Sequence, residues 1–182
     1  MQIVMWPPMG PNKVTSVFLV FIVLSPLSFP LLIEGGDYQE IYEKVNNFTL
    51  EGWDFKLGKS LQDLRAIGKV LRETTTPVDN PHNQNQKDEI RELFFDGLRI
   101  LAYFPAKDPH RLLLQEVEVS KRKFKIKHGL DIGVPTSKVT GVLGKPTEAN
   151  VDVYIYRGET NAVYFHIKNE AVVRVRWELY VD

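Results

Sequence analysis

The chain contains no cysteine, which excludes disulfide bonds, a thiolate nucleophile, a cysteine-ligated metal and a cysteine-attached lipid. It also lacks an excess of either charge, because 23 lysines and arginines balance 23 aspartates and glutamates. A neutral chain gives no reason to expect a nucleic-acid partner. With 43% hydrophobic and 25% charged residues, the composition excludes a disordered acidic tail and a polytopic membrane protein. The length of 182 residues is enough for one compact domain or two small ones.

Long hydrophobic runs are confined to residues 1–33. After Lys13, residues 14–33 carry no charge, and a short positive start followed by an apolar stretch is the pattern of a secretory signal. About 20 residues also suffice to cross a bilayer. Acidic residues follow from Glu34 onward, which favours an N-terminus inside and the remainder outside. We expect residues 1–33 to be a signal peptide or membrane anchor, cleaved or retained, and the protein to be periplasmic, membrane-anchored or extracellular. A buried core segment is the alternative.

The remainder of the chain carries the same pattern twice. Residues 57–69 and 132–145 each contain an apolar–Gly step, a polar residue suited to a helix start, apolar positions at helical spacing and a closing glycine. The sequence therefore predicts a first unit over 34–120 and a second unit over 121–182.

Each short helix is followed by stretches with the alternation typical of strands. These stretches are 93–95, 98–104 and 112–119 in the first unit and 151–156, 162–168 and 171–181 in the second. A further helix is expected from 38 to 45, and a long polar loop over 72–91. A helix followed by an antiparallel meander, twice, predicts an α+β fold of tandem helix-plus-antiparallel-sheet repeats.

The second unit carries a resemblance to a known family. Ile132-Gly133 through Val139, Leu143-Gly144-Lys145-Pro146, Tyr154-x-Tyr156 and Val163-Tyr-Phe165 resemble the SmpA/OmlA (BamE-like) and beta-lactamase-inhibitor-protein-like modules. The resemblance implies a helical segment packed on an antiparallel sheet, in tandem, with a protein-binding role in the envelope or outside the cell. Two departures are the missing lipidated cysteine and the missing disulfides.

Strand alternation predicts a surface that binds a protein partner. We expect Val163, Val173 and Trp177 to face the helices, so that tyrosine and arginine side chains lie on the opposite face. Both residue types are enriched at binding hot spots, because they bury a large area and keep a polar group. The alternatives are that these residues only cover an exposed sheet, or that the other repeat packs against them. The predicted partner-binding residues are Tyr154, Tyr156, Tyr164, His166, Arg174, Arg176 and Tyr180.

A single run of basic residues stands out. It alternates with Phe124 and Ile126, which predicts a strand with one wet face, and lysines on an edge strand also discourage aggregation. As a functional surface, the run would bind anionic lipid or an acidic partner. The predicted basic patch consists of Lys121, Arg122, Lys123, Lys125 and Lys127.

Motifs for catalysis are weak. The segment 52–60 resembles a phosphate loop, but five residues separate its glycines where the motif needs four. The histidines lack metal-site spacing, although His82 with Asp79 and Glu89 offers one candidate metal site in the polar loop. No Gly-x-Ser-x-Gly nucleophile elbow occurs.

We therefore expect no catalytic site, cofactor or metal. The sequence predicts an exported, non-enzymatic protein-binding module, either an envelope assembly or integrity factor or an inhibitor of a secreted enzyme. The alternatives are a protein that binds anionic lipid or the membrane surface through residues 121–127, with membrane association through residues 14–33, and, more remotely, a hydrolase.

Overall fold

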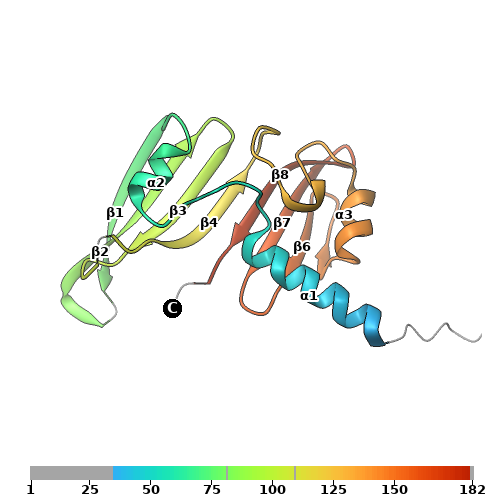
Figure 1. Cartoon of the computed structure of the whole chain (residues 1–182), viewed down its shortest axis with the longest axis horizontal. Helices are drawn as coiled ribbons and strands as arrows, with labels where there is room; N and C mark the ends of the chain where they lie inside the picture. Colours follow the sequence, from blue (N-terminus) through green and yellow to red (C-terminus); the bar gives the residue numbers. More distant parts are fainter. Residues whose placement is uncertain (1–34, 81, 109, 181–182) are drawn as a thin grey trace, which may run out of the picture. The chain divides into compact units, whose positions relative to one another are not determined.

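The computed structural model describes residues 35–80, 82–108 and 110–180 (Figure 1). The chain divides into residues 1–32 and 33–182, and everything described belongs to the second unit. The predicted signal or anchor segment, residues 1–33, lies outside the described residues. Within the described residues, no helix has both the length and the apolar character needed to cross a membrane.

The predicted α+β class is confirmed, with a single antiparallel sheet of eight strands among the described residues. The strands are β1 (Arg72–Asn80), β2 (Asn83–Phe95), β3 (Leu98–Phe104), β4 (Leu113–Val119), β5 (Glu148–Ala149), β6 (Val153–Arg157), β7 (Ala162–Lys168) and β8 (Ala171–Glu178). Their order across the sheet is β1-β2-β3-β4-β8-β7-β6-β5. Two four-stranded meanders therefore meet where β4 pairs with β8.

The helices lie on one face of this sheet (Figure 1). The helical elements are α1 (Gly35–Glu51), α2 (Leu61–Ala66), the short 3-10 helix η1 (Lys127–Gly129) and α3 (Thr136–Leu143). Helix α2 lies over the first meander, where its Arg65 pairs with Glu73 of β1, while α1 packs against β6, β7, β8 and α3 of the second. The helix expected from 38 to 45 is thus longer than predicted, and it covers the meander that is further away in sequence.

Local signals explain where the short helices begin and end. The Ser60 hydroxyl accepts a hydrogen bond from the backbone N–H of Asp63, and the Asp63 carboxylate accepts one from the backbone N–H of Ser60. This reciprocal capping box satisfies two free donors at the start of α2. Backbone N–H donation from Lys59, followed by the Ser60 hydroxyl, lowers the pKa of Asp63. At the end of α3, Gly144 has a φ of 75°, which favours glycine.

The prediction of a polar loop over 72–91 is wrong, because β1 and most of β2 occupy this segment as a hairpin. β-branched residues such as Thr74 favour strands, and β1 is the edge of the sheet, where polar side chains remain in water. Pro77 is compatible with this position, since an edge strand does not need every backbone N–H. The polar side chains of this edge hairpin are therefore the reason why a loop was predicted.

The core between helices and sheet is centred on Trp177 of β8. Its indole Nε1 donates a hydrogen bond to the Phe48 carbonyl at 3.0 Å, and its ring meets Trp53 edge-on with centroids 5.6 Å apart. Phe48 in turn stacks on Phe165 at 5.9 Å. A side chain at Gly52 would place its Cβ 2.6 Å from the Trp177 Nε1, so only glycine fits. Aromatic pairs of this kind stabilise beyond their buried area.

Replacing Leu143 with alanine is expected to lower the free energy of unfolding by about 2–4 kcal/mol, because truncation of a fully buried leucine leaves a cavity. Val173, which is 41% exposed, provides the control, and Val173→Ala should change stability by less than about 0.5 kcal/mol. Urea unfolding followed by circular dichroism measures both. A small change for Leu143→Ala would mean that α3 is not part of the core.

Candidate functional site

The sheet face turned away from the helices, here called the open face, carries polar side chains on its central strands. Val117 and Trp177 point into the core and are fully buried, so their neighbours along β4 and β8 point to the other side. Cross-strand register brings the residues of four strands together there. We call this set the polar centre; its members are Arg99, Glu116, Glu118, Tyr164, His166, Arg174, Arg176 and Glu178.

Arg99 of β3 anchors one side of the polar centre. Its guanidinium donates to Glu92 of β2 at 2.8 Å, forms an ion pair with Glu116, and lies 3.6 Å from a carboxylate oxygen of Glu118. The side chains of Glu116 and Glu118 are only 14% and 16% exposed. Partly buried charges are screened less than surface charges, so this arginine holds the two carboxylates in place.

Two arginines of β8 approach the same carboxylates from the other meander. Arg176 donates to Glu178 at 2.8 Å and lies 3.6 Å from Glu116, and Arg174 lies 3.8 Å from Glu118. Glu116 and Glu178 face each other across β4 and β8, a like-charge pair that would repel without these arginines. The polar centre therefore couples the two meanders electrostatically.

Tyr164, Arg176 and Glu178 contact one another within the polar centre. The Arg176 guanidinium lies 4.4 Å from the centre of the Tyr164 ring, and the Tyr164 hydroxyl donates to Glu178 at 2.7 Å. Burial, followed by this hydrogen bond to the carboxylate, raises the pKa of Tyr164. These contacts hold an aromatic ring and a guanidinium in one orientation.

The structure brings only part of the predicted partner-binding set together. Tyr180 follows the end of β8, is 65% exposed, and donates its backbone N–H to Asn161 Oδ1. The residues found together on the open face are Tyr164, His166, Arg174 and Arg176.

The placement of Tyr154 and Tyr156 on the open face is wrong. Tyr154 pairs with Phe165 and Tyr156 with Val163, so both tyrosines lie on the core face, and Tyr156 is 1% exposed. Its hydroxyl donates to the Gly144 carbonyl at 2.9 Å, and burial raises its pKa. A tyrosine whose hydroxyl has a hydrogen-bond partner is as suitable for a core as for a surface. Alternation of residue types therefore could not show which face of this strand is turned to the core, and the prediction chose the wrong one.

Val173 is also misplaced in the prediction, because a β-bulge interrupts β8. His166 pairs with Arg174, but the next residue, Ile167, pairs with Val172, which leaves Val173 as the extra residue. Val172 is fully buried while Val173 is 41% exposed. The bulge thus turns Val172 instead of Val173 into the core, while Arg174 stays on the open face opposite His166.

Sequence reasoning missed the acidic half of the polar centre. Glu116 and Glu118 alternate with the buried Val117 and Val119, so the period of two was visible in β4. What the sequence did not reveal is that β4 pairs with β8, which places these carboxylates beside the β8 arginines.

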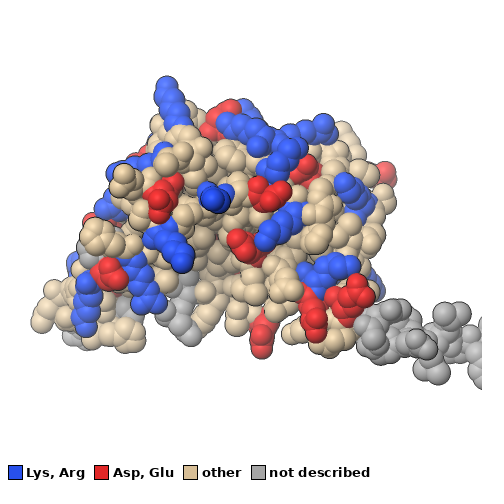
Figure 2. Space-filling model, in the orientation of Figure 1, with Lys and Arg blue, Asp and Glu red and all other residues tan. Residues whose placement is uncertain are grey.

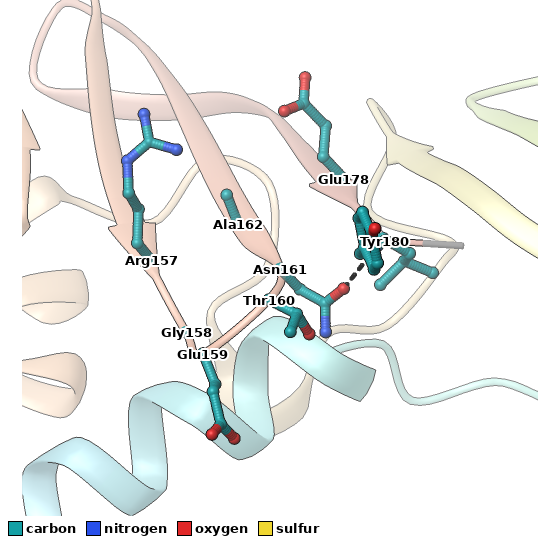
Figure 3. A pocket seen from close by; sticks show the side chains of 9 residues that line it. Arg157, Gly158, Glu159, Thr160, Asn161, Ala162, Glu178 and Tyr180 are labelled. Carbon is teal, nitrogen blue, oxygen red and sulfur yellow. Dashed lines mark hydrogen bonds between the residues drawn. The ribbon is translucent and has the colours of Figure 1, made fainter. Parts of the chain in front are cut away.

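A shallow hollow extends the open face where the β6–β7 turn meets the end of β8 (Figure 3). Ala162 lies between Arg157 and Glu178, since the register places the three residues in one row across β6, β7 and β8. The small side chain leaves a recess between two long ones. Asn161 and Tyr180, joined by a hydrogen bond of 2.7 Å, border it.

The strand predicted over 121–127 is wrong. The chain there makes turns and one isolated bridge between Ile126 and Trp53, followed by η1. The segment after α1 crosses at this point, since the Asp54 N–H donates to the Lys125 carbonyl and the Lys127 N–H donates to the Gly52 carbonyl, both at 2.8 Å. Because only one segment crosses here, residues 121–127 have no neighbouring sheet strand in the described part of the chain with which to pair.

The side chains of the basic patch are exposed, but they already form ion pairs or hydrogen bonds within the protein. In Figure 2, lysines and arginines gather along the upper margin, above the loop that joins β4 to α3. Both Lys121 and Lys123 form ion pairs with Asp96, the second at 3.2 Å. The remaining contacts are Lys125 with Asp131 at 3.1 Å, Lys127 with Glu51 at 3.5 Å, and Arg122 with the Ile132 carbonyl at 2.7 Å.

The candidate metal site of His82, Asp79 and Glu89 does not assemble. Asp79 pairs with Lys87 and Glu89 with Arg91. Across residues 35–80, 82–108 and 110–180, no group of three or more potential metal ligands comes together.

Asp88 of β2 is a buried carboxylate. It accepts hydrogen bonds from the Ala106 backbone N–H at 2.8 Å, from the Tyr103 hydroxyl, and from the Asn80 side chain at 3.2 Å. The Ala106 N–H and then the Tyr103 hydroxyl hold its pKa below the ordinary range. These bonds tie the β1–β2 hairpin to the end of β3, which is a structural role.

Asp88→Asn is expected to lower the melting temperature at pH 7. Because the folded-state pKa of Asp88 is lowered, its contribution is present above the unfolded-state pKa of about 3.9 and is lost as the pH falls through the folded-state value. The difference from the parent protein should therefore shrink below about pH 4. Asp79→Asn, at a side chain 78% exposed, is the control and should show no such difference; a constant deficit at every pH would contradict this role.

Tyr156→Phe is expected to cost about 1 kcal/mol of unfolding free energy, because it leaves the Gly144 carbonyl without its donor. Tyr154→Phe, on the same strand and face, serves as the control and should change stability by less than about 0.5 kcal/mol. Chemical denaturation measures both, and equal values would show that the hydroxyl of Tyr156 is not engaged.

Comparisons with known proteins give no match for the chain. No family model matches it. A search of the curated proteins gives no match, and a search of the solved structures gives none either. The resemblance to SmpA/OmlA and beta-lactamase-inhibitor-protein-like modules therefore remains a prediction from the residues.

Proposed function

We propose that the protein is an exported, non-enzymatic binding module that captures a protein partner on its open face. The observation that carries the proposal is the Tyr164–Arg176–Glu178 group, in which an aromatic ring and a guanidinium are held in one geometry by a stacking contact and a hydrogen bond. Rigid tyrosine and arginine side chains bind with little loss of conformational entropy, and they are the residue types that dominate binding hot spots.

The binding surface is built by two helix-plus-meander units in tandem. Helix α2 precedes the meander β1–β4, and α3 precedes β5–β8. The units join through their last strands, β4 and β8, which pair antiparallel. The segments before the two short helices also cross, at Trp53 and Ile126. This arrangement supports the resemblance to tandem modules, and with it a binding role outside the cytoplasm.

Export is supported by the uncharged stretch 14–33 that precedes the folded part. Two partner classes follow. An inhibitor would block a soluble secreted enzyme at a molar ratio of one to one, whereas an envelope assembly or integrity factor would co-purify with membrane components. Enzyme inhibition by the purified protein and its distribution between membrane and soluble fractions separate the two classes.

Binding of anionic lipid through the basic patch is the weaker alternative. Lys121 and Lys123 share Asp96, so part of the positive charge is neutralised within the protein. Each remaining lysine near an anionic bilayer contributes about 1 kcal/mol. Vesicles with and without anionic lipid test this alternative.

The double variant Tyr164→Ala/Arg174→Ala is expected to lose its partner while keeping the fold. Arg174 is chosen over Arg176 because its side chain is 43% exposed against 27%, so its removal disturbs the polar centre less. The measurement is affinity capture of tagged full-length protein from gently solubilised native cells, with partners identified by mass spectrometry.

The matched control for this capture is Lys121→Ala/Lys123→Ala, which removes two exposed residues of the basic patch. A stoichiometric partner retained by the control and lost by the open-face variant supports the proposal. Retention by the open-face variant with loss in the control would transfer binding to the basic patch. Circular dichroism must show that both variants are folded.

A further inference from the structure

We propose that His166 and Arg174 form a proton-operated latch on the open face, in which neutral His166 holds the Arg174 guanidinium in place and a proton on the imidazole releases it. What the latch regulates rests on the proposed function, because both residues belong to the polar centre. The latch itself is a property of the folded chain and is measurable without the partner.

The geometry fixes the form of the histidine. His166 of β7 lies directly opposite Arg174 of β8, and a guanidinium nitrogen is 3.2 Å from the imidazole Nδ1. An arginine has donors and no acceptor, so Nδ1 must be the unprotonated, accepting nitrogen. The ring proton of the neutral tautomer is therefore on Nε2.

The surroundings oppose a second proton on this ring. The Nε2 atom is buried and makes no hydrogen bond within the described part of the chain, so no acceptor stabilises an imidazolium there. On the other side, a protonated Nδ1 would point a donor at the donors of Arg174. A charged histidine in this position has neither nitrogen satisfied, which costs free energy.

Charges around the ring act in the same direction. The charged groups that face it are Arg174 and Arg176 of β8 and Glu118 of β4, while its β6 neighbour Val153 is apolar. Burial, followed by the two arginines, lowers the pKa of His166 below the ordinary value, and Glu118 offsets only part of this effect. His166 is thus neutral at neutral pH and takes up a proton only in a more acidic medium.

Protonation has a defined consequence for the open face. When Nδ1 carries a proton, its bond with Arg174 is lost and the two cations repel. The guanidinium is already paired with Glu118 at 3.8 Å, so this carboxylate remains as its partner once the bond to the imidazole is lost. A partner that contacts Arg174 next to His166 is therefore expected to bind less tightly as the pH falls through the pKa of His166.

The test is an NMR titration of the imidazole signals of the full-length protein in neutral detergent, with His166→Gln used to assign the His166 resonances. We expect the neutral ring to carry its proton on Nε2 and to titrate below the ordinary histidine value of about 6.5. Arg174→Gln should raise the titration midpoint. Lys168→Gln, which removes one positive charge from the same strand without touching the ring, should leave it unchanged.

A midpoint at or above the ordinary value, a neutral ring with its proton on Nδ1, or a midpoint insensitive to Arg174→Gln would each overturn the latch. Failure of the proposed function looks different. In that case the titration behaves as expected, but the Tyr164→Ala/Arg174→Ala variant captures the same partner as the parent protein.

Discussion

The burial of Trp177 is the interaction on which the rest of the structure depends. It lies on β8, the last strand in sequence, which pairs with β4 on one side and β7 on the other and so joins the two meanders. Its indole also binds the carbonyl of Phe48 in α1 and contacts Trp53 in the segment after α1. Residues more than a hundred positions apart thus meet at one side chain, so the second meander and its junction with the first are not completed until β8 is in place.

The polar centre is a consequence of this packing. Because Trp177 and Val175 face the core, the period of two along a strand turns Arg176 and Glu178 to the open face. Pairing of β8 with β4 then sets Glu116 beside them. The arginines therefore do not occupy the open face by chance: the aromatic core fixes the register, and the register determines which charges meet.

Much of the second meander could be predicted from its sequence, because its signals are local. Alternating residues mark β7 and most of β8, and Gly144 ends α3. The orientation of β6 could not be predicted, since Tyr156 suits a core and a surface equally well. The edge hairpin β1–β2 was hidden by its polar side chains. The Glu116–Arg176 contact depends on the pairing of β4 with β8, a non-local choice that no short pattern records.

Pairing within the polar centre also determines what a partner gains there. Glu116 and Arg176 are 14% and 27% exposed, and each already has its counter-charge, so a partner cannot derive much affinity from charge alone. On the proposed function, its gain would come from burying Tyr164 together with Val153 and Ile155, which share the open face. The charges then act through complementarity: a surface that leaves one of them buried and unpaired is rejected. Affinity from aromatic and aliphatic contacts, with specificity from fixed charges, would distinguish the proposed binding face from the exposed lysines of the basic patch.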